Sequence, residues 1–171
     1  MMEFILTESE FNEDNTAWNG NRFLMGNGYF GIRGTLGEYT KKQMCAVNMA
    51  GIYDKMGNSW RESVNAPNPL YTYIKVNGKI YALPDEKPKF HQQELDFRYG
   101  IHSRVTHWQT EHGNITVVCE RFASIARQHN IAMKYTFSVD FDCEAEIITG
   151  IDGDVWDING PHFVKMKIGS K

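Results

Sequence analysis

The chain has 171 residues, of which 42% are hydrophobic and 23% are charged, and its formal net charge is −3. This composition excludes a disordered chain, and the mild acidity excludes the basic surface that binds nucleic acid. Every long apolar stretch is interrupted by polar residues, so we expect no membrane-spanning segment. The length suits one domain over residues 1–171, or a piece of a longer protein.

The amino terminus and the cysteines indicate the cellular compartment in which the protein is expected. Residues 1–8 lack the basic and apolar regions of a secretory signal. No CxxC pair occurs among the three cysteines, Cys45, Cys119 and Cys143. Three such thiols fit reduced cysteines in a reducing compartment better than a disulfide framework. We therefore expect a cytoplasmic protein.

Short runs of alternating apolar and polar residues predict strands throughout the chain. In chain order, these runs cover residues 44–53, 70–76, 79–83, 101–109, 115–122, 131–139, 145–151 and 163–168. No segment longer than about ten residues keeps a helical period, which favours packed antiparallel sheets. We therefore predict an all-β fold class. The last run lies close to the end of the sequence, and we expect the chain to be truncated within or just after a strand.

Three of these strand predictions are specific. Asn77-Gly78 between the second and third runs favours a type I′ hairpin turn, because both residues tolerate positive φ angles. Residues 111–114 supply the turn of a second hairpin, between residues 101–109 and 115–122. In the 131–139 run, one face carries the apolar side chains and is expected to point into the core: Ile131, Met133, Tyr135, Phe137 and Val139.

The longest irregular stretch covers residues 54–69, Asp54 to Pro69, and is the first functional candidate. Irregular stretches longer than about 12 to 15 residues are usually functional or partner-contacting loops. The alternative is a long surface turn that Trp60 holds against its own sheet. A second irregular stretch, residues 84–91, is charged and is predicted to be a solvated connector.

Several other motifs lack the sequence context that their functions require. Residues 26–31 match GxGxxG, but further glycines follow where a dinucleotide-binding motif requires a helix. His102 and His107 lie on opposite faces of a predicted strand, and residues 152–157 lack the ligands of a calcium loop, so no metal site is expected. No GxSxG nucleophile elbow is present. The residues alone thus indicate an all-β domain, with carbohydrate binding through exposed aromatic side chains as one possibility.

Residues 21–35, NRFLMGNGYFGIRGT, resemble the opening signature of glycoside hydrolase family 65, which contains maltose, kojibiose, nigerose and trehalose phosphorylases. Further segments resemble the same family in the same order: residues 50–53, 64–68, 95–98, 103–104, 120–124 and 151–155. The resemblance covers most of the chain, which argues against coincidence.

The resemblance implies a fold and a reaction. Family members are several times longer than this chain and carry an N-terminal β super-sandwich of the galactose mutarotase-like type, a helical linker and an (α/α)₆ catalytic barrel. This chain would be the first part of the super-sandwich. The reaction would be inverting phosphorolysis, in which a glutamic acid protonates the leaving oxygen while inorganic phosphate attacks the anomeric carbon to give β-glucose 1-phosphate. Phosphate would be a co-substrate, and no other cofactor is expected.

The resemblance places the general acid in the barrel. No residue here matches it, including Glu94, Glu111 and Glu120, so we expect no catalytic residue in this chain and no activity from it alone. The expected contribution comes from residues 54–69, which would line the mouth of the substrate site. There Trp60 would stack on a sugar, Arg61 would order a hydroxyl or phosphate, and Asn65 would donate a hydrogen bond. The expected partners are the protein's own catalytic domain, the disaccharide and a second copy in a homodimer.

Two other functions compete with this one. The first is the N-terminal domain of a hydrolase of the same family, such as a trehalase, in which water replaces phosphate. The missing export signal counts against it. The second is a stand-alone carbohydrate-binding module, which would display an aromatic strip on a finished sandwich. The strand at the end of the sequence counts against that. The disaccharide itself is not determined by this chain.

Overall fold

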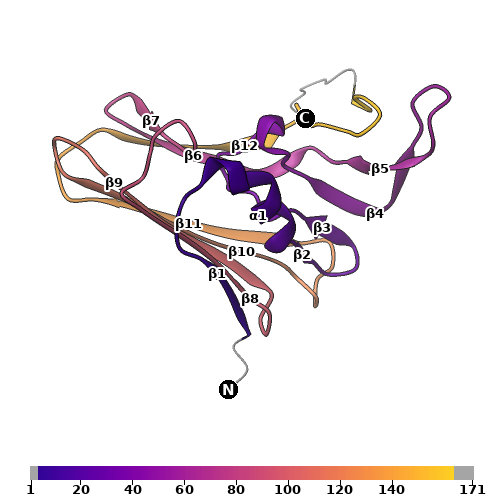
Figure 1. Cartoon of the computed structure of the whole chain (residues 1–171), viewed down its shortest axis with the longest axis horizontal. Coiled ribbons are helices and arrows are strands. Elements are labelled where there is room, and N and C mark those ends of the chain that lie inside the picture. The colour runs from indigo at the N-terminus through magenta and orange to yellow at the C-terminus, as the bar shows by residue number, and fades with distance from the viewer. Residues whose placement is uncertain (1–3, 164–171) are drawn as a thin grey trace, which may run out of the picture.

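The computed structural model describes residues 4–163, and its regular structure is almost entirely β (Figure 1). The strands are β1 (Ile5–Glu8), β2 (Met25–Gly26), β3 (Phe30–Ile32), β4 (Val47–Asp54), β5 (Glu62–Asn65), β6 (Asn68–Val76), β7 (Lys79–Tyr81), β8 (Phe90–Asp96), β9 (Ile101–Gln109), β10 (Asn114–Ala123), β11 (Ile131–Val139) and β12 (Ala145–Asp152). The helical segments are η1 (Glu13–Asn15), α1 (Thr16–Arg22) and η2 (Lys41–Gln43). None of these helices has the length and apolar character needed to cross a membrane. The predicted all-β class is confirmed.

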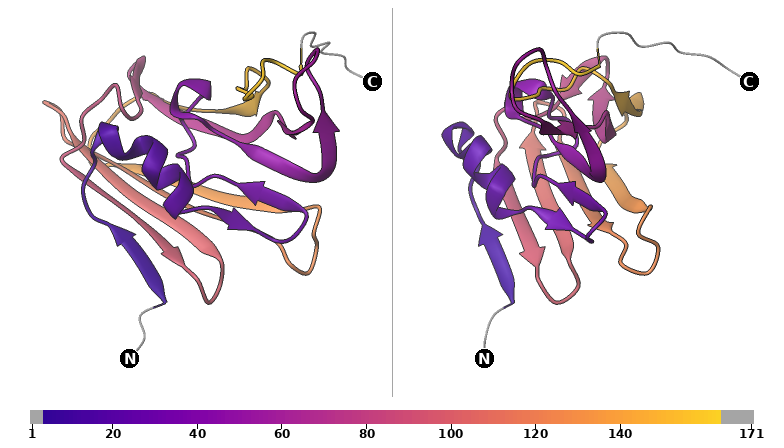
Figure 2. Two further views of the ribbon diagram at one scale, coloured as in Figure 1. Left: turned by 45° about the vertical axis from the view of Figure 1, so that its right-hand side comes forward. Right: turned by 90° about the vertical axis from the view of Figure 1, so that its right-hand side faces the viewer.

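The strands form three antiparallel sheets in two layers. One layer is a five-stranded sheet in the order β1-β8-β9-β10-β11. The other layer contains a three-stranded sheet, β12-β6-β7, and a four-stranded sheet, β2-β3-β4-β5. Both views of Figure 2 show the five-stranded sheet facing the two smaller ones, with α1 alongside the two layers. The chain is thus a β-sandwich.

The specific strand predictions are confirmed. Asn77 and Gly78 form the turn between β6 and β7 with φ angles of 50° and 76°. β9 and β10 pair across the second predicted turn, with Asn114 opposite Gln109. The apolar face of β11 packs against the two core clusters, although its side chains are only partly buried because β11 is at the end of its sheet. The strand predicted at residues 163–168 lies outside the described residues after its first position.

Two predictions about irregular segments were wrong. Residues 54–69 are not one long loop, because they include the end of β4, all of β5 and the start of β6. Residues 84–91 are not wholly a solvated connector, because β8 begins at Phe90 and His91 is 3% exposed. A strand of four residues such as β5 is too short to show a clear alternation of apolar and polar side chains. In β8 the inward residues are largely polar, so its apolar alternation is hidden in the sequence.

Two apolar clusters form the core between the layers. One joins Trp108, Ile115 and Val117 of the large sheet to Ile74 and Val76 of β6. The other is centred on Phe23, which is fully buried and lies between α1 and β2. Its members are Phe23, Met25, Ile32, Val47, Leu70 and Leu95. Burial of each such side chain stabilises the fold by about 1.5 to 3 kcal/mol.

A buried polar layer crosses the interior between these clusters. The guanidinium of Arg104 donates to both carboxylate oxygens of Glu38 at 2.8 Å, and the two side chains are 3% and 1% exposed. Arg121, also buried, donates to His102 Nδ1 at 2.9 Å. Burial, followed by the charge of Arg104, lowers the pKa of His91 to about 4, so this histidine is neutral in the fold. The interior therefore depends on matched polar partners as well as on apolar packing.

The sandwich is open along one side. Ile147 pairs with Ile74 of β6, so both belong to the inward face of their sheet. Ile74 is fully buried, whereas Ile147 is 49% exposed, and Ile151, at the register shift of β12, is 72% exposed. The inward side chains of β11 pack on the cluster that contains Ile74, so β11 lies opposite β6 and no described strand lies opposite β12. We name this surface, Ile147 and Ile151 with the inward face of β12, the open seam.

Candidate functional site

Trp60 and Arg61 lie at the end of the β4–β5 hairpin, which projects from the body of the sandwich at the upper right of Figure 1. Trp60 is 65% exposed, and Tyr53 on the neighbouring strand is 59% exposed. Arg61 is also exposed. The alternative interpretation, in which Trp60 packs as core, is therefore wrong. The hairpin presents aromatic and cationic side chains to the surroundings.

Asn65 has a different position and role. Its side chain is buried, and its Nδ2 donates to the carbonyl oxygens of Cys45 at 3.0 Å and Trp156 at 2.9 Å. Its Oδ1 accepts a hydrogen bond from Val47 N at 2.9 Å. Both amide hydrogens are thus used inside the chain. This corrects the expectation that Asn65 donates to a sugar: it joins β4, β5 and the segment after β12.

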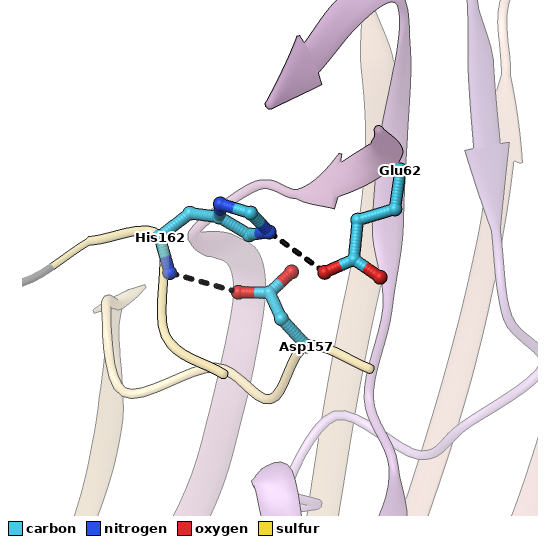
Figure 3. Close-up of side chains that lie close together, drawn as sticks. All are labelled: Glu62, Asp157 and His162. Carbon is cyan, nitrogen blue, oxygen red and sulfur yellow. Dashed lines mark hydrogen bonds and ion pairs between the residues drawn. The ribbon is translucent and has the colours of Figure 1, made fainter. Parts of the chain in front are cut away.

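A cluster of titratable side chains lies where β4 and β5 meet the 55–61 loop of the same hairpin. Glu62, Asp157 and His162 each place a possible ligand atom within 4.8 Å of the others (Figure 3). His162 Nε2 is 2.8 Å from Glu62 Oε1, and His162 Nδ1 is 3.1 Å from Asp54 Oδ2. The backbone N–H of His162 donates to Asp157 Oδ2 at 3.4 Å. These contacts tie the segment after β12 to both strands of the hairpin.

The protonation of His162 follows from its two partners. Carboxylates accept hydrogen bonds, so both ring nitrogens must carry hydrogens, and the ring is then an imidazolium. The hydrogen bond to Glu62 raises the pKa of His162, burial opposes this, and Asp54 and Asp157 raise it further. The His162 side chain is only 2% exposed. The imidazolium is therefore a buried cation held between carboxylates. We name this cluster of Asp54, Glu62, Asp157 and His162 the histidine clasp.

The clasp residues are of the types that bind divalent metals, yet their present contacts are those of a hydrogen-bonded cluster. Both oxygens of Glu62 accept from Asn159, Oε1 from its backbone N–H at 3.1 Å and Oε2 from Nδ2 at 2.8 Å. A metal would need His162 to lose a proton and Glu62 to lose these donors. The sequence analysis missed this cluster because its members lie at positions 54, 62, 157 and 162, on segments that are not neighbours in the chain.

We expect the clasp to release the hairpin as the pH rises. The folded-state pKa of His162 lies above the ordinary histidine value. Its stabilising contribution is therefore complete below about pH 6.5 and is lost as the pH rises through the folded-state pKa. Hydrogen-exchange protection factors of residues 53–61 should fall between acidic and alkaline pH, while those at the β6–β7 hairpin stay constant.

His162→Gln is the control for this prediction, because glutamine has no charge to lose over this pH range. The variant should show low protection of residues 53–61 at every pH. An identical pH profile in the variant and the unaltered chain would contradict the role given to His162.

Glycosyl hydrolase family 65, N-terminal domain, is the family description that matches this chain, and the match covers residues 6–168. The chain belongs to this family. It is 50% identical over 166 residues to a nigerose phosphorylase of Lachnoclostridium phytofermentans, a match that covers 97% of this chain and 22% of the relative. It is 38% identical over 145 residues to a 1,2-alpha-glucosylglycerol phosphorylase of Bacillus selenitireducens, covering 84% of this chain and 19% of the relative.

The same fold occurs in a solved structure from the human microbiome that is provisionally described as a kojibiose phosphorylase. The TM-score is 0.85 at 21% identity, and the match covers 98% of this chain and 24% of the other. The family 65 chain described here thus spans about a fifth of the length of the curated relatives it matches.

The opening signature of this family 65 domain is a structural element. Its GxGxxG-like residues 26–31 form the β2–β3 hairpin, with Gly28 at a φ of 86°, and the segment after β3 is not helical. Asn27 Oδ1 accepts from the backbone N–H groups of Tyr29 and Phe30 at 3.0 and 2.8 Å. Asn27 Nδ2 donates to Ser124 O at 2.7 Å. The signature therefore closes a turn and attaches it to the end of β10.

Proposed function

We propose that this chain is the non-catalytic N-terminal domain of an inverting disaccharide phosphorylase, which converts an α-glucoside and phosphate to β-glucose 1-phosphate and a sugar. The identity of 50% to a nigerose phosphorylase, over nearly the whole chain, carries the proposal. It makes nigerose the first substrate to test. The proposal includes cytoplasmic localisation, inorganic phosphate as co-substrate and the protein's own catalytic domain as partner.

The experiment compares the longer protein that contains this chain with the 171-residue chain alone. Each is incubated with nigerose in the presence and absence of inorganic phosphate. The longer protein should release β-glucose 1-phosphate only with phosphate, and the chain alone should release nothing. Glucose release without phosphate would support the family's hydrolytic alternative instead. Activity of the chain alone would overturn its non-catalytic role.

Within this function, the β4–β5 hairpin is proposed to line the mouth of the substrate site. Trp60 and Arg61 are exposed in its 55–61 loop, and the histidine clasp holds the two strands where they enter that loop. An indole ring offers a large flat surface for the C–H face of a pyranose. The guanidinium beside it can donate two parallel hydrogen bonds to a phosphate or a pair of hydroxyls.

Trp60→Ala in the longer protein is expected to raise KM for the disaccharide by roughly 2- to 10-fold, with a smaller change in kcat, because stacking aids binding more than bond cleavage. Initial-rate kinetics measures both constants. Trp18→Ala is the matched control, since Trp18 is 61% exposed on α1, away from the hairpin. Equal effects of the two substitutions would argue against a role of the hairpin at the substrate site.

A further inference from the structure

A groove with a volume of about 470 Å³ lies on the outer face of the β12-β6-β7 sheet. Alternate residues of β6 point into the core and are buried, so Tyr71 and Tyr73 point to the opposite face and form the floor of the groove. η2 forms one wall, and residues 82–85 form another. The groove therefore lies on the face of β6 opposite the core, in a part of the molecule that the hairpin and the clasp do not use.

The floor of the groove consists of two tyrosine rings that are inclined to each other. Their ring centroids are 5.5 Å apart, and the planes are inclined by 59°. The residue of β12 opposite Tyr71 is Gly150, where an added Cβ would meet no atom within 4 Å. The absent side chain leaves the ring of Tyr71 uncovered from the β12 side. The exposed face of one such ring suits the C–H face of a single pyranose ring, and the second, inclined ring forms a side wall.

Polar groups surround the aromatic floor in a fixed arrangement. The register of β12 shifts between Gly150 and Asp152, and such bulges change the direction of a side chain. Asp152 Oδ1 accepts from the backbone N–H of Asp154 at 2.9 Å. Lys41 Nζ donates to Asp154 Oδ1 at 2.7 Å, which ties η2 to the segment after β12. A capping box between Thr40 and Gln43 holds η2 itself.

The charges of the groove select the class of ligand. Asp85, Asp152 and Asp154 supply three carboxylates, against two ammonium groups from Lys41 and Lys42. The remaining lining carboxylate, Glu38, is already paired with Arg104. Excess negative charge repels a free phosphate, whereas carboxylates accept hydrogen bonds from sugar hydroxyls. Burial, followed by the neighbouring Tyr73 and Asp152, raises the pKa of Tyr71, so its hydroxyl remains a donor at neutral pH.

We propose that this groove is a carbohydrate-binding site that takes a hexose unit of a neutral glucoside, stacked on Tyr71 with Tyr73 beside it and hydrogen-bonded by Asp152 and Lys41. The inference uses the proposed function only to choose nigerose as the probe. A site of this kind would hold a sugar on the N-terminal domain itself, without any chemical step.

The test is a titration of the isotopically labelled chain with nigerose, followed by backbone amide chemical shifts. Millimolar binding should shift the amides of β6, η2 and residues 150–154. Tyr71→Ala should weaken binding by on the order of tenfold, because it removes the stacking surface. Gly150→Val should weaken it at least as much, because its side chain fills the gap over Tyr71 while every polar group remains.

The controls separate this site from other sugar contacts. Gly31→Val places the same side chain in a strand position where an added Cβ also meets no atom within 4 Å, and it should leave binding unchanged. Trp60→Ala should also leave it unchanged. Shifts confined to residues 53–61, equal losses in the two valine variants, no shifts at all, or phosphate shifting the same amides would each overturn the proposal. Phosphorolysis by the longer protein is measured separately, so failure of the groove and failure of the proposed function are distinguishable.

Discussion

Replacing Glu38 with alanine is expected to destabilise the fold by about 3 to 5 kcal/mol, because the buried guanidinium of Arg104 would keep its charge and lose its counterion. Glu38 accepts both of the 2.8 Å hydrogen bonds from Arg104, and the pair is almost completely inaccessible to solvent. A domain is stable by only about 5 to 15 kcal/mol, so this single change removes a large part of the free energy of unfolding. Urea denaturation followed by tryptophan fluorescence measures the loss.

Two further variants test this explanation. The double variant Glu38→Leu with Arg104→Met removes both charges and should recover much of the lost stability. Glu120→Ala breaks the exposed ion pair with Lys134, whose side chains are 48% and 76% exposed, and should cost less than about 1 kcal/mol. If Glu38→Ala and Glu120→Ala lowered the stability equally, the buried pair would not have the importance given to it here.

The 171-residue chain is expected to self-associate through the open seam. Ile147 belongs to the inward face of β12 yet is 49% exposed, and Ile151 on the same strand is 72% exposed. The edge of β12 has unpaired backbone groups among the described strands. In a symmetric dimer both copies of each isoleucine would be buried, so one substitution removes two buried side chains. At about 2 kcal/mol per buried side chain, Ile147→Lys or Ile151→Lys should weaken association by on the order of a hundredfold or more. Sedimentation equilibrium measures this directly.

The control for the seam is a second apolar surface, at the end of the sandwich where the β8–β9 turn lies. Phe97 and Tyr99 are 61% and 70% exposed there and line a groove of about 500 Å³. Tyr99→Lys should leave association through the seam unchanged. A purely monomeric chain at micromolar concentration, or an effect of Tyr99→Lys equal to that of Ile151→Lys, would contradict the assignment. An interface on the β4–β5 hairpin around the exposed Trp60 is the alternative, and loss of association in Trp60→Ala would support it.

The sequence predicted the strands that are long enough for an alternating side-chain pattern to be recognised. β6, β9, β10 and β11 have nine or ten residues each, which is long enough for a strand pattern to be recognised without the structure. The Asn77-Gly78 turn was equally clear, because few residue pairs adopt two successive positive φ angles. β2 has only two residues, and α1 has seven, so neither carries a readable pattern. Both are held by the packing of Phe23 and Met25 in the core.

The candidate sites were the least predictable part. Trp60 and Arg61 were identified as exposed functional candidates, but Asn65 beside them was misassigned, because burial depends on which segments fold over a residue. His162 was not considered, because its partners Asp54 and Glu62 are 108 and 100 positions away. The groove over Tyr71 depends on Gly150, a residue that becomes its neighbour only when β12 pairs with β6.

The amino-acid sequence by itself determined the all-β class, the long strands, the inward face of β11 and the family, because these follow from local alternation and from motifs that are continuous in the chain. Only the tertiary structure decided that Glu38 pairs with Arg104, that His162 joins the two strands of a hairpin where they enter its loop, and that Ile147 lies on an uncovered inward face. Each of these contacts joins segments far apart in sequence. Its geometry depends on how the sheets pair and pack, which no local pattern encodes.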